Sequence, residues 1–116
     1  MENVCVEFTL RHVGVNAKTP EESLRLVKLF SEAFGFAVKE GNSSNFAGSC
    51  IEVMKTPYLG KNGHIAIGAS DMEQAVALLK QRGFEMDEST AKYKNGELVA
   101  IYLKEDFGGF AVHLVR

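Results

Sequence analysis

Hydrophobic and polar positions follow two kinds of period along the chain, in an order that occurs twice. Residues 7–16 alternate in the manner of a strand, and residues 20–34 repeat apolar side chains every three or four positions, as an amphipathic helix does. Three further strands are expected near residues 36–40, 45–47 and 49–55. The first half of the chain therefore predicts the order strand, helix and three strands.

The same order returns after a short linker of turn-forming composition at residues 57–62. The second copy has an expected strand at 64–68, a helix ending near 83, weak strand signals at 84–87 and 91–94, and firmer strands at 98–104 and 110–115. We predict one α+β domain, residues 1–116, made of two βαβββ modules at about 7–56 and 63–116. The two modules are expected to pair into a curved mixed sheet around a cleft.

Both expected helices carry residues typical of helix ends. Thr19, followed by Pro20, has the features of an N-cap, and Gly35 is placed to end this first helix with a positive φ angle. Ser70 is expected to cap the second helix and Gly83 to end it. These signals predict where each helix begins and ends.

The chemistry suggested by the chain depends on its three histidines. When the two copies are superposed, His12 falls on His64, and Glu52 falls on His113. Each of the four residues is expected on the strand face away from the aliphatic side chains, on the first or last strand of a module. Imidazole and carboxylate ligands suit Zn, Ni, Fe(II), Co or Mn better than Ca or Mg. The pattern therefore predicts a divalent-metal site at His12, Glu52, His64 and His113.

Composition and charge exclude some classes of partner. The net charge of −2 gives no basic field, so nucleic acid and anionic membrane surfaces are not expected partners. No long apolar run is present, and we expect a cytoplasmic protein that acts on a small molecule. Cys5 and Cys50 are expected to be free thiols, with Cys50 buried as a small apolar residue.

The paired βαβββ plan with ligand-type residues on the first and last strands resembles the vicinal oxygen chelate superfamily. This superfamily includes glyoxalase I, extradiol dioxygenases, bleomycin-resistance proteins and methylmalonyl-CoA epimerase. Several strings are also similar to the C-terminal extension of some bacterial 2-keto-3-deoxy-6-phosphogluconate / 4-hydroxy-2-oxoglutarate aldolases. These strings are residues 46–48, 51–55, 58–67, 91–93, 100–103 and 108–115.

The resemblance implies a glyoxalase-type lyase or isomerase that acts on a small vicinal-oxygen substrate, such as a 2-oxo aldehyde or a sugar-acid derivative. It implies metal binding by His12, Glu52, His64 and His113, with Glu52 as the available base. A carboxylate is commoner at the position of His113, which leaves two alternatives open. These are a non-catalytic ligand-binding module of the bleomycin-resistance type and an Fe(II) extradiol-type dioxygenase.

The resemblance also bears on partners and on the substrate cleft. It implies a homodimer and a functional link or fusion to a sugar-acid aldolase, although the aldolase barrel itself does not fit in this chain. Tyr102 lies on the strand face opposite Val99, Ile101 and Leu103. We therefore expect Tyr102 to line the cleft and touch the substrate, the alternative being a solvent-exposed strand tyrosine.

Overall fold

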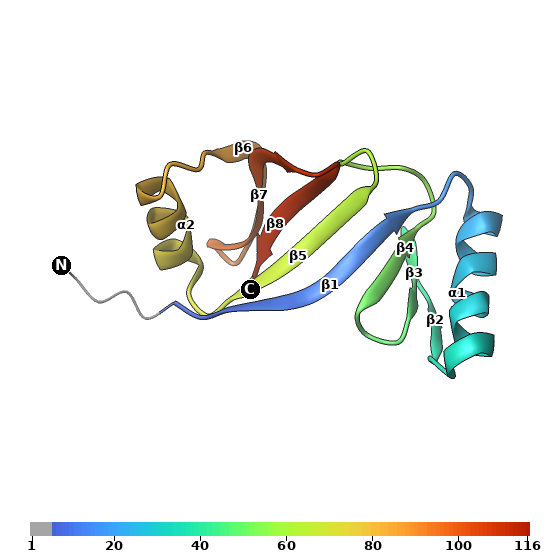
Figure 1. Ribbon diagram of the computed structural model, residues 1–116. Helices are drawn as coiled ribbons and strands as arrows, with labels where there is room; N and C mark the ends of the chain where they lie inside the picture. Colours follow the sequence, from blue (N-terminus) through green and yellow to red (C-terminus); the bar gives the residue numbers. More distant parts are fainter. Residues whose placement is uncertain (1–5) are drawn as a thin grey trace.

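The computed structural model describes residues 6–116, which form the two helices and eight strands shown in Figure 1. The first half contains β1 (Phe8–Asn16), α1 (Pro20–Phe34), β2 (Val38–Glu40), β3 (Ser44–Ala47) and β4 (Ile51–Met54). The second half contains β5 (Gly63–Ala69), α2 (Met72–Gln81), β6 (Met86–Lys94), β7 (Glu97–Phe107) and β8 (Phe110–Val115). The predicted α+β class with a mixed sheet is confirmed.

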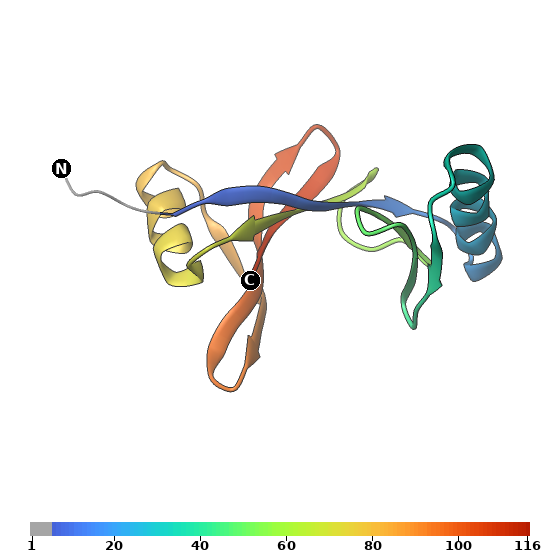
Figure 2. The ribbon, with the colours of Figure 1, turned by 90° about the horizontal axis from the view of Figure 1, so that it is seen from below.

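All eight strands belong to one sheet, in the order β2-β3-β4-β1-β5-β8-β7-β6. Within each half the first and last strands run parallel, β1 beside β4 and β5 beside β8. The two halves join where β1 pairs antiparallel with β5. Figure 2 shows β1 running along the middle of the molecule, with the two helices at opposite ends. The four strands that carry the candidate ligands are therefore neighbours at the centre of the sheet.

Local signals explain both ends of α1 but only part of α2. The hydroxyl of Thr19 accepts the N–H of Glu22 at 3.1 Å, and Gly35 ends α1 with φ 77°. In α2, the predicted cap at Ser70 is wrong by one residue. The Asp71 carboxylate accepts the N–H of Gln74 at 2.9 Å, whereas the Ser70 hydroxyl accepts the N–H of Glu7, also at 2.9 Å. The Ser70 hydroxyl thus bonds to Glu7, far away in the sequence, and does not cap α2.

Two apolar cores lie on the sheet face that the helices cover. The buried members of the first are Ala17, Val27, Ala47 and Val53, and those of the second are Ala69, Met72, Ala75, Met86, Ile101, Leu103, Val112 and Leu114. Because side chains alternate along a strand, the residues between them point to the opposite face. We call this opposite face the histidine face; it carries His12, Gly14, Glu52, His64, Tyr102 and His113.

Two further expectations from the sequence differ in part from the structure. The weak strand signals near 84–87 and 91–94 belong to the single strand β6, whose register with β7 is irregular between Asp87 and Lys92. Cys50 is a free thiol, as expected, but it is exposed because it lies in the turn between β3 and β4. Cys5 lies outside the described residues.

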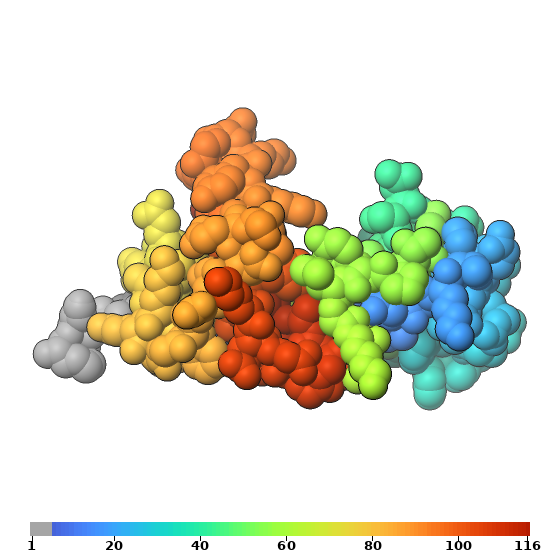
Figure 3. Space-filling view, turned by 90° about the horizontal axis from the view of Figure 1, so that it is seen from above, coloured from blue at the N-terminus to red at the C-terminus, as the bar shows by residue number. Residues whose placement is uncertain are grey.

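The linker between the halves is held against both of them. The side-chain amide of Asn16 on β1 donates to the carbonyl of Gly60 at 2.9 Å. The N–H of Asn62 donates to the carbonyl of Gly109 at 2.7 Å, in the turn between β7 and β8. Figure 3 shows this linker, in green, against the red end of the chain. These bonds tie the start of β5 to both neighbouring strands.

Neither helix within residues 6–116 has the length and apolar character needed to cross a membrane.

Candidate metal centre

Cross-strand register brings Glu52 and His64 together over a glycine. Gly14 on β1 pairs with Glu52 on β4 and with His64 on β5, so the three residues form one row across the sheet. A Cβ atom added to Gly14 would overlap the imidazole ring of His64. The His64 ring therefore lies over the β1 backbone and reaches Glu52 across the space that a side chain at position 14 would fill.

The next row across the sheet carries His12 and His113. Ala66 on β5 pairs with His12 on one side and with His113 on the other. The β1–β5 register shifts between Leu10 and His12, which makes Arg11 a bulged residue. Downstream of this bulge, His12 and Gly14 share the histidine face. The small side chain of Ala66 leaves the two imidazoles room to meet above it.

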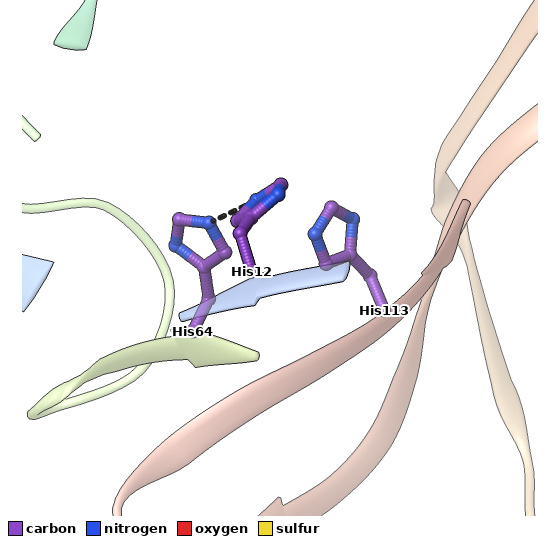
Figure 4. Close-up of side chains that lie close together, drawn as sticks. All are labelled: His12, His64 and His113. Atoms are coloured by element: carbon purple, nitrogen blue, oxygen red, sulfur yellow. Dashed lines mark hydrogen bonds between the residues drawn. The ribbon is translucent and has the colours of Figure 1, made fainter. Parts of the chain in front are cut away.

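The candidate ligands come from four different strands; His12 and His64 lie close to both of the others, Glu52 and His113. Oε1 of Glu52 lies 2.9 Å from Nε2 of His64 and 3.2 Å from Nε2 of His12. The two Nε2 atoms of His12 and His64 are 3.3 Å apart. One ring nitrogen from each histidine, His113 included, lies within 4.8 Å of the others. Figure 4 shows the three rings turned toward one another from β1, β5 and β8.

These separations fit a single divalent ion. Two ligand atoms that sit about 2.0–2.1 Å from one ion at tetrahedral or octahedral angles lie about 2.9–3.4 Å apart. The three contacts among His12, Glu52 and His64 fall within this range. The three histidines could therefore hold a metal ion, and Glu52 contacts two of them, His12 and His64.

Glu52 is ionised and fixed by hydrogen bonds. Burial by itself would raise its pKa, but hydrogen bonds to His12, His64 and Ser44 outweigh burial, and the pKa lies well below its usual range. The Ser44 hydroxyl on β3 donates to Oε2 at 2.6 Å, which leaves Oε1 to face the histidines. The ring of Phe46, also on β3, packs edge-on against His12 at 5.7 Å. The carboxylate is thus held in one orientation from the side of β3.

His113 is partly buried against the rings of Tyr102, His64 and His12 and is neutral at pH 7. Burial, followed by the charges on His64 and His12, lowers the pKa of His113 to about 4. Within residues 6–116, neither ring nitrogen of His113 has a hydrogen-bond partner, and Nδ1 of His64 also has none. Buried polar atoms are normally paired, and a neutral imidazole nitrogen is the form that binds metal.

Tyr102 lies on the histidine face, but it is packed against His113 rather than exposed. The two rings are parallel within 9°, with centroids 4.4 Å apart, and Tyr102 is 7% exposed. Burial, followed by the charges of Tyr58 and Glu52, raises the pKa of Tyr102 to about 12, so its phenol is neutral. The expected contact between Tyr102 and a substrate stays a prediction.

Sequence reasoning missed the roles of Gly14, Ser44 and Phe46. Ser44 lies just outside the strand expected at 45–47, but it belongs to β3, where Phe46 pairs directly with Glu52. A usable signal was present, because a short hairpin through the turn after Ala47 places alternate residues of β3 beside Glu52. The need for glycine at position 14 becomes visible only when Glu52 and His64 are known to flank it.

No family model and no curated protein matches the chain, but several solved structures resemble it over nearly its whole length. A hypothetical protein, BH1468 from Bacillus halodurans, has a TM-score of 0.63 at 15% identity and covers 94% of both chains. A variant of methylmalonyl-CoA epimerase from Streptomyces coelicolor, in complex with 2-nitronate-propionyl-CoA, has a TM-score of 0.63 at 19% identity and covers 92% of both.

Methylmalonyl-CoA epimerase from Mycobacterium tuberculosis has a TM-score of 0.62 at 18% identity, covering 91% of this chain and 85% of that one. At such low identity, these likenesses establish the arrangement of the elements. The α+β architecture, with two βαβββ halves in one mixed sheet, matches that of the epimerases. The chain therefore has the glyoxalase-type, or vicinal oxygen chelate, fold.

Proposed function

We propose that this protein is a divalent-metal isomerase or lyase of the glyoxalase type, with His12, Glu52, His64 and His113 as the metal ligands. The observation that carries the proposal is the grouping of one ring nitrogen from each of three histidines, together with the ionised Glu52 carboxylate that contacts His12 and His64. Zn, Ni, Fe(II), Co and Mn all suit this donor set. The epimerase neighbours support isomerase chemistry over lyase chemistry.

The candidate ligands have two proposed roles, metal binding and proton transfer. A bound divalent ion would act as a Lewis acid that polarises a substrate carbonyl and makes the adjacent C–H bond more acidic. Glu52 is the single carboxylate among the four positions, and we assign it as the base that takes this proton. Its hydrogen bonds to His12 and His64 keep the pKa of Glu52 low. Glu52 would become an effective base only when these two histidine nitrogens bind another partner.

A hollow beside the candidate metal centre supports a small polar substrate. It has a volume of about 380 Å³ and shares Ser44 and Phe46 with the surroundings of Glu52 and His12. Lys39, Glu40, Ser43 and Ser49 add polar groups of both charges to its lining. This volume lies within the range of small-molecule sites. We propose that the oxygen-rich end of a 2-oxo aldehyde or sugar-acid derivative binds the ion while the rest of the molecule extends toward this hollow.

Exchange of a substrate proton with solvent deuterium tests the proposed reaction. Metal-loaded protein would be incubated in D₂O with 2-oxo aldehyde hemithioacetals, sugar-acid derivatives and methylmalonyl-CoA, and followed by proton NMR. We expect loss of the signal of a proton adjacent to a carbonyl for at least one compound. Glu52→Gln, which keeps an oxygen ligand, should lower this exchange by about 10²-fold or more. Glu32→Gln, an exposed carboxylate on α1, is the matched control and should change nothing.

Failure of exchange separates the proposed enzyme from a ligand-binding module. If a compound raises the melting temperature and is recovered unchanged without exchange, the protein binds without catalysis, as bleomycin-resistance proteins do. Exchange that persists in Glu52→Gln at the wild-type rate would remove Glu52 as the base while leaving metal binding intact.

A second candidate function follows from the contacts of Glu52. Two histidines and one carboxylate that meet within 3.3 Å resemble the facial arrangement of Fe(II) oxygenases. Oxygen consumption by the Fe(II)-loaded protein with a catechol would support a dioxygenase. No consumption across a broad panel of vicinal diols would count against it.

We also propose a homodimer and a functional link to a sugar-acid aldolase, both on the resemblance described from the sequence. The dimer is tested by light scattering coupled to gel filtration. The link is tested by asking whether the protein changes the product profile of such an aldolase when both act on one reaction mixture.

A further inference from the structure

We propose that Tyr102 is the positioning residue for His113, because its ring sets the imidazole orientation in which His113 faces the other candidate ligands. The proposal rests on the proposed metal site and explains how its fourth ligand, His113, is oriented. In this role Tyr102 packs against a metal ligand and does not contact the substrate.

His113 lacks the support that metal-binding histidines usually have. Such histidines almost always donate their second ring N–H to a carboxylate, carbonyl or water, which fixes the ring orientation. Within residues 6–116, neither Nδ1 nor Nε2 of His113 has any such partner. Hydrogen bonding among the described residues therefore does not hold this ring, and its orientation must come from packing.

The face of Tyr102 supplies that packing. Tyr102 on β7 pairs directly with His113 on β8, and the two rings stack with centroids 4.4 Å apart and planes 9° apart. On its other side, the His113 ring meets His64 edge-on at 5.3 Å. Rotation of the imidazole about its side-chain bonds would break the flat contact with Tyr102 and bring the ring against its neighbours. The imidazole is thus confined between a parallel ring and a perpendicular one.

Tyr102 is itself held firmly enough to serve as a fixed surface. It is 7% exposed, and its backbone N–H donates to the hydroxyl of Thr90 at 2.9 Å. The ring of Tyr58, from the linker between the halves, packs against it at a centroid distance of 6.1 Å and an angle of 67°. The stacking uses the flat face of the phenol and not its hydroxyl, so phenylalanine should replace tyrosine here.

Metal titration of three variants tests the proposal. Tyr102→Leu should weaken Ni or Zn binding about 10- to 100-fold, the usual effect of losing a residue that orients a ligand. Tyr102→Phe should bind as the wild type does. Tyr93→Leu, which removes an exposed tyrosine from β6, is the matched control and should also leave binding unchanged. Equal affinity of Tyr102→Leu and wild type would overturn the proposal, as would an equal loss in Tyr102→Phe.

A measurement on the metal-free wild type keeps the proposal testable if Tyr102→Leu does not fold. The stacked phenol should shift the ring-proton NMR signals of His113 upfield relative to those of His12, and Tyr102→Phe should preserve the shift. Ring protons of His113 at unstacked positions would contradict the proposal. Absence of metal binding by the wild type would instead refute the proposed metal site, and the NMR result would still decide whether Tyr102 orients His113.

Discussion

A missing side chain at position 14 gives His64 its place in the candidate metal centre. Gly14→Ala puts a methyl group where the His64 imidazole now lies. The backbone at Gly14 does not need a positive φ angle, so the effect is steric. We predict at least a tenfold loss of Ni or Zn affinity, with about 1–3 kcal/mol of destabilisation from overpacking. Calorimetric metal titration and urea unfolding measure the two effects.

Gly68→Ala is the matched control for Gly14→Ala. Gly68 also lies on the histidine face of the central strands, but an added Cβ there would meet the end of the flexible Arg11 side chain and the hydroxyl of Thr9. Neither side chain is a candidate ligand and both can rotate aside, so metal affinity should stay within about twofold of wild type. Equal losses in both variants would show that any added methyl on these strands disturbs the site.

The hydroxyl of Ser44 orients Glu52 without touching the histidines. Removing it in Ser44→Ala takes away the donor to Oε2, so the pKa of Glu52 should rise and the carboxylate should be held only through Oε1. We predict about a tenfold loss of metal affinity. Ser43→Ala, an exposed neighbour, should have no effect. Unchanged affinity in Ser44→Ala would mean that Glu52 needs no support from β3.

At the scale of elements, a buried polar network joins α1 to the strands that carry Ser44 and Glu52. The Ser23 hydroxyl on α1 donates to the carbonyl of Val53 at 2.8 Å and accepts from the Asn45 amide at 3.0 Å. Both polar residues are nearly completely buried. Loss of the hydroxyl leaves the carbonyl and the amide without this partner in a site that water does not reach.

We therefore predict that Ser23→Ala destabilises the protein by about 1–3 kcal/mol. Urea unfolding followed by circular dichroism checks this value, with Ser31→Ala on the same helix as the control. A change of less than about 0.5 kcal/mol, the usual range for surface substitutions, would contradict the importance assigned to the network.

Local and repeated patterns in the sequence predict much of this architecture. They do not predict which side chains meet across neighbouring strands. Thr19 and Gly35 mark α1 because cap chemistry acts over a few residues. The cap of α2 was misplaced because Ser70 bonds to a residue far away in the chain. The stacking of Tyr102 on His113 depends on register and strand curvature, which no local pattern encodes.

For the whole molecule, the candidate metal centre bridges two halves that otherwise join mainly through β1 and β5. His12 and Glu52 come from the first half, and His64 and His113 come from the second. Metal at 100 times its Kd should stabilise the folded state by about 2.7 kcal/mol. For a chain of this size, that corresponds to a rise in Tm on the order of 10 °C. Chelator should reverse the rise, which differential scanning fluorimetry can follow.

His64→Ala is the variant that makes this thermal shift informative. It removes a ligand from the second half while leaving the sheet pairing in place, so the rise in Tm on adding metal should fall to near zero. An undiminished rise in His64→Ala would show that the metal stabilises the protein from another site.

The count of metal ions per chain tests the central claim most directly. After expression without chelator, addition of Ni, Zn, Mn or Fe(II), and dialysis, mass spectrometry of the metal should find about one equivalent per chain. The double variant His12→Ala/His64→Ala should retain less than about a tenth of an equivalent. Less than about a tenth of an equivalent in the wild type with every one of these metals would contradict the account.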